Sequence, residues 1–320
     1  MQTRPLHNVH SAYENGLKLY LNIFDSIFTR AKNENEFEYI LSILNVRGEQ
    51  DAGWDGLENL RDIYKSYYKS KRKIAKTRAS THFSLFFYGI IFEADDLYDI
   101  IANMLNTIAG DGYRVVNFPS SADKNGRVQF QHPLDKTNQL KKWANKVDLD
   151  LSIYDELLDN ELRNAVFHSK YTVYWPEIRL FDPPRIIPFE EWMTIINKAL
   201  AYVEAFFKVL DIHRKQYSTP VIIEPSPGFT QNRDEKAITI IRNNYGVVGL
   251  KSHFQGAAPP EGYPMFKIGK FLPYEDVLME RGELILPSNK IEKINSVLRF
   301  LPDRVRRYIV KKIGPRYLTR

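Results

Sequence analysis

The sequence of 320 residues contains no cysteine. This absence excludes disulfides, thiolate zinc sites, iron–sulfur clusters and cysteine nucleophiles, and it fits a reducing cytoplasm. The longest apolar run, Phe83–Phe92, has ten residues, whereas a membrane-spanning helix needs about 20. The N-terminal residues lack the apolar segment of a signal peptide. We therefore expect a soluble, cytoplasmic protein that does not contact a membrane.

Several common catalytic motifs are also missing. There is no GxxxxGKS/T loop, no GxGxxG after a strand pattern, no GxSxG and no HExxH. His7 and His10 have no third ligand at a metal-binding spacing. Outside the motif described below, the remaining histidines stand alone in the sequence: His82, His132, His213 and His253. We expect neither a metal ion nor a cofactor.

Basic residues are concentrated in two segments. Lys65–Arg78 and Arg304–Arg320 each contain seven basic and no acidic residues, so the rest of the chain carries a net charge of −8 although the whole chain carries +6. Both segments include tyrosines, and such segments can follow a phosphate backbone and stack on bases. A solvated helix face or a tail would have the same composition. We predict that they bind RNA through Lys69, Lys71, Arg72, Lys73, Arg306, Arg307, Lys311 and Lys312.

The first 218 residues have mostly helical patterning. Apolar side chains recur at spacings of three and four, which is typical of amphipathic helices. The pattern predicts helices over about 13–28 and 37–48, a third that begins at about residue 57 and runs into the basic segment Lys65–Arg78, and further helices over about 81–109, 135–146, 151–170 and 189–215. Gly110 is predicted to end the fourth helix. Between the helices we expect strand-like pieces at Arg114–Phe118 and Arg127–Gln131, and a proline-rich loop or short hairpin over 171–188.

The last third of the chain differs in composition. Residues 219–320 contain 10 of the 17 prolines and 8 of the 16 glycines. Strands are predicted at Val221–Glu224, Phe266–Leu272 and Glu283–Leu286, with one helix beginning at Ser288. The expected fold is therefore mainly α: a helical domain over 1–218, followed by a small α+β appendage with a basic tail over 219–320.

One motif combines residues that are suited to phosphate chemistry. The stretch LRNAVFHSKY places Arg163, Asn164 and His168 in the form R-N-x-x-x-H. It lies on a predicted helix that follows an acidic turn and precedes an aromatic, proline-rich loop. Over Ser152–Tyr174 this pattern resembles the signature of the HEPN superfamily. The resemblance implies a compact helical bundle and a role in RNA cleavage, as in prokaryotic toxins, phage-defence proteins and some RNA-processing factors.

The residue types agree with metal-independent cleavage of RNA. Because RNA supplies its own nucleophile, the 2′-hydroxyl, the enzyme needs proton transfer and stabilisation of charge. His168 is suited to proton transfer near neutral pH. Arg163 offers a cationic fork for the phosphate, and the amide of Asn164 can orient it. We therefore expect a HEPN-type endoribonuclease.

Helix geometry raises a question about these three residues. Asn164 and His168 share a helix face, whereas Arg163 and His168 are about 140° apart. The arginine must reach around the helix, or the helix must distort, or a second subunit must supply the partner. In the HEPN family the motif faces its copy across a dimer cleft, so the resemblance implies a homodimer. It also implies an antitoxin or a defence partner.

Two structural explanations compete with catalysis. Asp159 and Arg163 are spaced for an i,i+4 salt bridge, and His168 lies next to an apolar stripe in which it could pack. The alternative function is a catalytically inactive HEPN-like module that serves dimerisation or nucleic-acid binding.

Overall fold

The computed structural model describes residues 5–45, 56–71, 77–114, 116–119, 121–122, 128–217, 237–243, 246–253, 277–280 and 283–285. This part of the chain is mainly helical, as expected. Contacts divide the chain into two compact units, one formed by Met1–Ala31 with Gly53–Val209 and the other by Lys32–Ala52 with Leu210–Arg320. The domain boundary at residue 218 stays a prediction. None of the described helices has the length and apolar character needed to cross a membrane.

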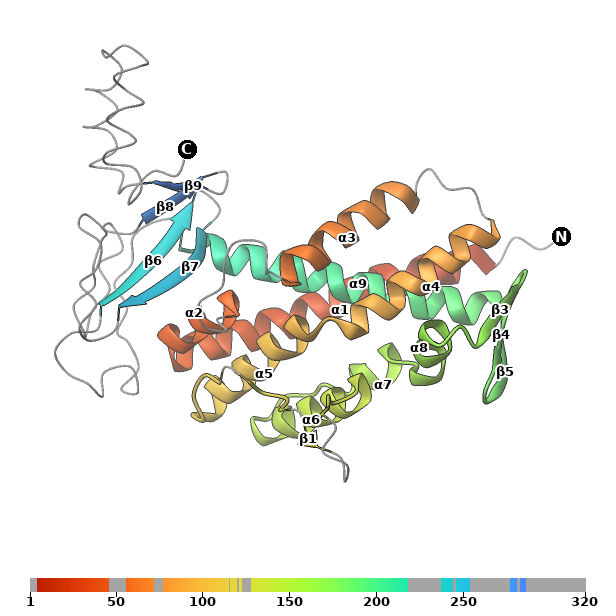
Figure 1. Cartoon of the computed structure of the whole chain (residues 1–320), viewed down its shortest axis with the longest axis horizontal. Coiled ribbons are helices and arrows are strands. Elements are labelled where there is room, and N and C mark those ends of the chain that lie inside the picture. The colour runs from red at the N-terminus through yellow and green to blue at the C-terminus, as the bar shows by residue number, and fades with distance from the viewer. Residues whose placement is uncertain are drawn as a thin grey trace, which may run out of the picture. The chain divides into compact units, whose positions relative to one another are not determined.

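The helices follow the apolar spacing of the sequence, with four differences: two breaks and two earlier helix ends (Figure 1). Their bounds are α1 (Pro5–Glu34), α2 (Glu36–Leu44), α3 (Gly56–Lys71), α4 (Arg78–Glu93), α5 (Asp95–Ala109), α6 (Pro133–Lys146), α7 (Ile153–Leu157), α8 (Asn160–Phe167) and α9 (Phe189–Lys215).

Aromatic side chains join α1 to α9 in the core of the first unit. Phe24 is fully buried, with its ring centroid 5.3 Å from that of Tyr202 and 5.5 Å from that of Phe206. Tyr20 and Phe28 lie one turn to either side of Phe24 on α1. Tyr20 contacts the ring of Tyr202, and Phe28 contacts the ring of Phe206. Edge-to-face pairs of this kind add to the stabilisation from burial of the rings. The apolar residues whose spacing predicted the first and last helices therefore include the residues that pack α1 against α9.

The predicted helix over 81–109 is wrong as a single element, because the chain breaks at Ala94. This residue has extended backbone angles, φ −76° and ψ 94°. Asp95 and Asp96 begin α5, where carboxylates favour a helix N-terminus. The buried hydroxyl of Tyr98 donates to the carbonyl of Phe92 at 3.0 Å. The break leaves Glu93 as the last residue of α4, next to the motif. The predicted end at Gly110 is confirmed, with φ 75°.

The predicted helix over 151–170 is also two helices, α7 and α8. Leu158 and Asp159 between them are extended, and the Asp159 carboxylate caps α8 by accepting from the backbone N–H of Leu162 at 2.9 Å. Tyr88 of α4 hydrogen-bonds to the backbone at this break. Its buried hydroxyl accepts from the N–H of Asp159 at 2.8 Å and donates to the carbonyl of Leu157 at 3.1 Å. This tertiary contact replaces backbone bonds that a continuous helix would make.

α8 ends at Phe167, three residues before the predicted end. Ser169 adopts φ 54°, in the left-handed region, so the helix cannot continue through it. The N–H of Lys170 donates to the carbonyl of Ala165 at 2.8 Å, and the N–H of Ser169 to that of Val166 at 3.4 Å. These are the two bonds of a Schellman cap. His168 is therefore the cap residue of α8.

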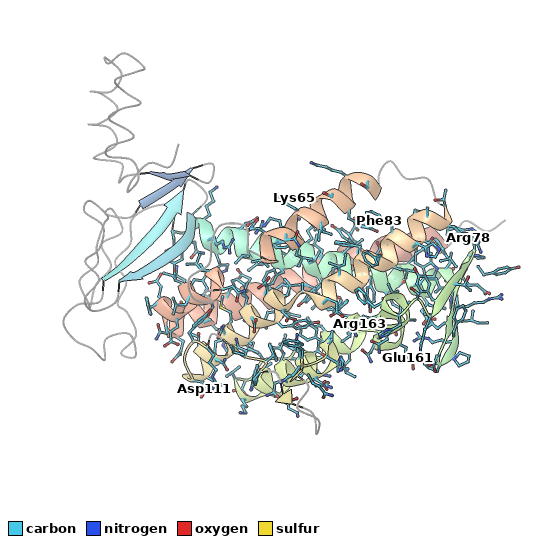
Figure 2. The ribbon with its side chains drawn as sticks, viewed as in Figure 1. Lys65, Arg78, Phe83, Asp111, Glu161 and Arg163 are labelled. Carbon is cyan, nitrogen blue, oxygen red and sulfur yellow. The ribbon has the colours of Figure 1, made fainter. Side chains whose placement is uncertain are left out.

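The segment 171–188 is more ordered than the predicted loop or hairpin. It forms a three-stranded antiparallel sheet of β3 (Tyr171–Tyr174), β4 (Glu177–Phe181) and β5 (Pro184–Ile187). The Nε of Arg78 donates to the carbonyl of Val173 at 2.9 Å, and the indole N–H of Trp192 donates to the carbonyl of Pro176 at 3.2 Å. These bonds attach the sheet to α4 and α9, beside α8 (Figure 2).

A two-stranded ribbon of β1 (Ser121–Ala122) and β2 (Val128–Gln129) precedes α6. β2 lies within the strand-like piece predicted at Arg127–Gln131. The other predicted piece, Arg114–Phe118, is wrong, because its described residues form no strand.

α8 packs directly on α4. A Cβ added to the buried Gly89 of α4 would lie 2.6 Å from the ring of Phe167. The ring occupies the space that a larger residue at position 89 would fill, so glycine permits the close approach of the two helices.

The second unit contains α2 and the C-terminal end of α9. Buried His213 is hydrogen-bonded to the hydroxyl of Tyr39 at 2.6 Å. α2 ends at Leu44 before Asn45, which has φ 51°, four residues short of the predicted end at Gly48.

A four-stranded sheet also belongs to this unit, in the order β7-β6-β8-β9. Its strands are β6 (Ala237–Asn243), β7 (Gly246–His253), β8 (Val277–Glu280) and β9 (Glu283–Ile285). β9 confirms the strand predicted at Glu283–Leu286. The other two predicted strands and the helix from Ser288 lie outside the described residues.

Candidate active site

The three residues of the motif line one solvent-open hollow of about 460 Å³. Its wall comes from the start of α6, from α8, from the turn after α8 and from the turn between β4 and β5. The lining residues are His132, Leu134, Asp135, Asn160, Arg163, Asn164, Ala165, His168, Lys170 and Asp182. The structure thus brings Arg163, Asn164 and His168 together within a single chain.

Arg163 is held in place by two contacts. Its guanidinium forms an ion pair with Glu93 at the end of α4, and its Nη1 donates to Oδ1 of Asn164 at 2.6 Å. The side chain of Arg163 is only 11% exposed, and burial lowers the pKa of its guanidinium below the ordinary value for arginine. An arginine has five N–H donors, so the two contacts leave others for a ligand. The buried Nε has no partner among the described residues.

Asn164 and His168 present free polar groups to the hollow. Since Oδ1 of Asn164 accepts from Arg163, its amide nitrogen remains a donor. The imidazole of His168 is exposed and has no hydrogen-bond partner among the described residues. His168 is the C-cap residue of α8, and its N–H still donates to the Asn164 carbonyl at 3.0 Å, so the offset of about 140° from Arg163 remains. Arg163 and His168 nonetheless line the same hollow within one chain, so a second subunit is not needed to bring them together.

Five further polar residues line the hollow, and the sequence did not single them out as site residues: His132, Asp135, Asn160, Lys170 and Asp182. Lys170 and Asp182 form an ion pair at 2.9 Å, and the hydrogen bond from Lys170 lowers the pKa of the Asp182 carboxyl. His132 precedes α6, and its imidazole is exposed and without a partner among the described residues. Lys170 follows the motif directly and could have been found. No local pattern links His132 to α8, because only the tertiary structure places α6 beside it.

The competing structural explanations do not describe these residues. Asp159 does not pair with Arg163, as an i,i+4 salt bridge would require. It caps α8 and pairs with Arg185 of β5 at 2.9 Å. His168 is exposed and does not pack in the apolar stripe, which is formed by Leu162, Ala165 and Val166.

The predicted RNA-binding residues are only partly described. Lys69 is exposed on the last turns of α3, whereas the side chain of Lys71 lies outside the described residues. Arg72, Lys73, Arg306, Arg307, Lys311 and Lys312 also lie outside them. In Figure 2, Lys65 on α3 and Arg163 on α8 lie on different sides of α4. The structure therefore does not bring Lys69 into the hollow.

Within the described ranges, no group of three or more histidine and carboxylate side chains is placed to hold a metal ion. The polar groups of the hollow are instead two imidazoles, two cations, two carboxylates and the amides of Asn160 and Asn164. This is a set for binding an anion and moving protons.

Comparison with protein-family models, with curated proteins and with solved structures finds no match for this chain.

Proposed function

We propose that the protein is a metal-independent endoribonuclease of HEPN type. The observation that carries the proposal is the single hollow in which Arg163, Asn164 and the unpartnered imidazole of His168 meet. The helical fold and the resemblance of the motif point in the same direction. A packing role would require these side chains to be buried or saturated, and His168 is neither.

Each residue has a role in cleavage of the RNA backbone. His168 transfers a proton to or from a reacting oxygen. Arg163, fixed by Glu93, stabilises the negative charge that accumulates on the phosphate oxygens. Asn164 directs its free amide N–H groups to the same phosphate. The reaction forms a 2′,3′-cyclic phosphate and releases a 5′-hydroxyl.

The first test is cleavage of a mixed-sequence RNA by the purified protein in EDTA. We expect cleavage by the wild type and a loss of about 10²- to 10⁴-fold in rate for His168→Ala, because that is the usual contribution of a proton-transfer group. His82→Ala is the matched control, since His82 is also exposed but lies outside the hollow and bonds Tyr171 at 2.8 Å. A folded His168→Ala protein with wild-type activity contradicts the proposal.

The homodimer stays part of the proposal, with a surface that suits it. Phe83 and Phe86 of α4 and Phe167 of α8 are 42%, 52% and 37% exposed. The rings of Phe86 and Phe167 are 5.9 Å apart, and the guanidinium of Arg163 lies 5.5 Å from the centroid of Phe167. A second copy of the chain would bury these rings and bring the two motif helices near each other.

Light scattering tests this association. We expect Phe86→Glu to shift the protein from dimer to monomer, because it places a charge in the centre of the apolar surface. Ile212→Glu is the control, since Ile212 is 58% exposed at the far end of α9. A wild-type monomer at assay concentration contradicts the dimer.

The basic segments are proposed to hold the RNA backbone outside the hollow. Each phosphate contact with single-stranded RNA contributes about −0.7 to the slope of log K against log salt. Neutralising Arg306, Arg307, Lys311 and Lys312 should flatten that slope and leave the rate at saturation unchanged. An unchanged slope contradicts RNA binding by the C-terminal segment.

The alternative is a catalytically inactive HEPN-like module. The same assays separate the two, because such a module binds RNA or dimerises without cleaving any RNA. A toxin or antiphage role, with an antitoxin or defence partner, follows only from the HEPN resemblance and requires the cleavage activity first.

A further inference from the structure

The hollow contains a second histidine that the motif does not include. His132 and His168 come from different elements, the residue before α6 and the cap of α8, yet they line the same space. Both imidazoles are exposed, and neither has a hydrogen-bond partner among the described residues. The two imidazoles thus line one hollow, and neither side chain makes a hydrogen bond that would hold the described part of the fold together.

Cleavage of RNA by its own 2′-hydroxyl needs two proton transfers. A base must take the proton of the 2′-hydroxyl while the O2′–P bond forms. An acid must protonate O5′ while the P–O5′ bond breaks. One imidazole cannot be both deprotonated and protonated at the same time, so a second group is required.

We propose that His132 is this second group, so that His132 and His168 of one chain form the acid–base pair. The inference rests on the endoribonuclease proposed above and adds a catalytic residue to it. In the forward reaction one imidazole gains the 2′-hydroxyl proton and the other gives its proton to O5′. Exchange with water then restores both imidazoles, so no oxidant, metal or further reactant is needed.

The surroundings of His132 suit either role. The charged groups that face the hollow are Asp135 from α6, Arg163 from α8, and Lys170 with Asp182 from the sheet side. Lys170 and Asp182 neutralise each other through their ion pair at 2.9 Å, and Arg163 is paired with Glu93. The charged groups around the two imidazoles therefore include both signs, and most of them are in ion pairs.

The side chain of His132 can be changed without disturbing α6. Its backbone carbonyl begins the helix by accepting from Asp135 and Lys136 at 2.9 and 3.1 Å, and its side chain makes no capping bond. His132→Ala keeps both backbone bonds. We expect it to fold with a wild-type thermal midpoint.

Kinetics on an RNA oligonucleotide provide the test. The wild type should show a bell-shaped profile of kcat/KM against pH, and His132→Ala and His168→Ala should each lose about 10²- to 10⁴-fold and one limb of the bell. The matched control His82→Ala should keep both limbs. A merely structural role for His132 would lower activity without removing a limb.

A sulfur substitution assigns the two roles. In an oligonucleotide with a 5′-bridging phosphorothiolate at the mapped cleavage site, the leaving thiolate needs no proton. One of the two histidine variants, the one without the acid, should regain activity on this substrate. Equal impairment of both variants on both substrates would overturn the pairing.

A mixing experiment tests whether the pair belongs to one chain. His132→Ala and His168→Ala chains, mixed and refolded together, should stay inactive, because no hollow then contains both histidines. Recovery of activity would overturn the single-chain pair. If His132→Ala keeps wild-type activity while His168→Ala is inactive, this inference fails and the endoribonuclease stands. If His168→Ala is also active, the endoribonuclease fails as well.

Discussion

The two ends of α8 differ in how many of their polar side chains are paired. At its N-terminal end every charged group that the structure describes is paired: Arg185 contacts Asp159, Glu161 and Glu191 at 2.9, 3.2 and 2.7 Å. At its C-terminal end the imidazole of His168 has no hydrogen-bond partner among the described residues, and it lines an open hollow. Glu161 and Arg163 lie only two residues apart on this short helix (Figure 2).

This difference indicates which polar groups stabilise the fold and which are available to a ligand. Saturated polar groups have already exchanged water for protein partners, so they stabilise the fold and have little left to offer a ligand. Unpartnered polar groups in a hollow stay hydrated until a ligand replaces the water. We therefore expect changes at the N-terminal end to alter stability and changes at the C-terminal end to alter activity.

The largest expected effect lies at the residues of α8 that line the hollow, among them Arg163, which pairs with Glu93 and Asn164 but keeps further donors for a ligand. Arg163→Ala should lower kcat by about 10²- to 10³-fold on RNA, because it removes a donor aimed at developing charge. Glu93→Gln is the matched variant. It keeps an acceptor for Arg163, and we expect its activity within tenfold of wild type. Single-turnover assays on proteins checked by circular dichroism measure both. Wild-type activity in Arg163→Ala would mean that Arg163 has only a structural role.

The second effect concerns the break that begins α8. Tyr88→Phe removes the hydroxyl that bonds the backbone of Leu157 and Asp159, and burial raises the pKa of that hydroxyl above the ordinary value for tyrosine. The unpaired backbone groups should lower the free energy of unfolding by about 1–3 kcal/mol. Urea unfolding measures the loss. A stable Tyr88→Phe protein would show that the break does not depend on α4.

The third effect tests the paired end itself. Partial burial opposes the charge of Arg185, yet the surrounding carboxylates raise the pKa of its guanidinium. Arg185→Met keeps much of the side-chain length and should lower stability by about 1 kcal/mol. The loss should shrink in high salt, which screens the repulsion among the remaining carboxylates. RNA cleavage should be unchanged. A large loss of activity would contradict the view that the N-terminal end of α8 contributes only to stability.

The smallest effect is a gain in stability. Ser169 is held at φ 54°, where glycine is preferred. Ser169→Gly relieves that conformation at the cost of a more flexible unfolded chain, and we expect a net gain of about 0.5 kcal/mol. The urea midpoint should rise while cleavage stays the same. If cleavage falls, the conformation of the turn at Ser169 is needed to position His168.

Much of the helical fold could be predicted from the sequence. Local spacing of apolar residues located α1, α3, α6 and α9, because one buried stripe per helix is a property of the sequence alone. Gly110 ended α5 as expected, since its positive φ suits glycine. The motif itself was visible because its three residues are close together along the chain.

The breaks at Ala94 and Leu158–Asp159 could not be predicted in the same way. Both interrupt apolar patterns that continue across them, and side-chain hydroxyls on other turns, Tyr98 and Tyr88, satisfy the backbone groups that the breaks expose. Tyr88 lies 71 residues from Asp159, and a local pattern does not record such a partner. Tyr98 lies only six residues from Phe92, but its hydroxyl contacts that carbonyl because the chain has already turned at Ala94.

By itself the sequence determined the helical class and the presence of Arg163, Asn164 and His168 on one short stretch. Only the tertiary structure decided that α8 ends at Phe167, that Glu93 pairs with Arg163 and that His132 lines the same hollow as His168. The reason is physical. Helix formation depends on neighbours within a turn or two, whereas a site depends on which distant elements pack together to bury their apolar faces.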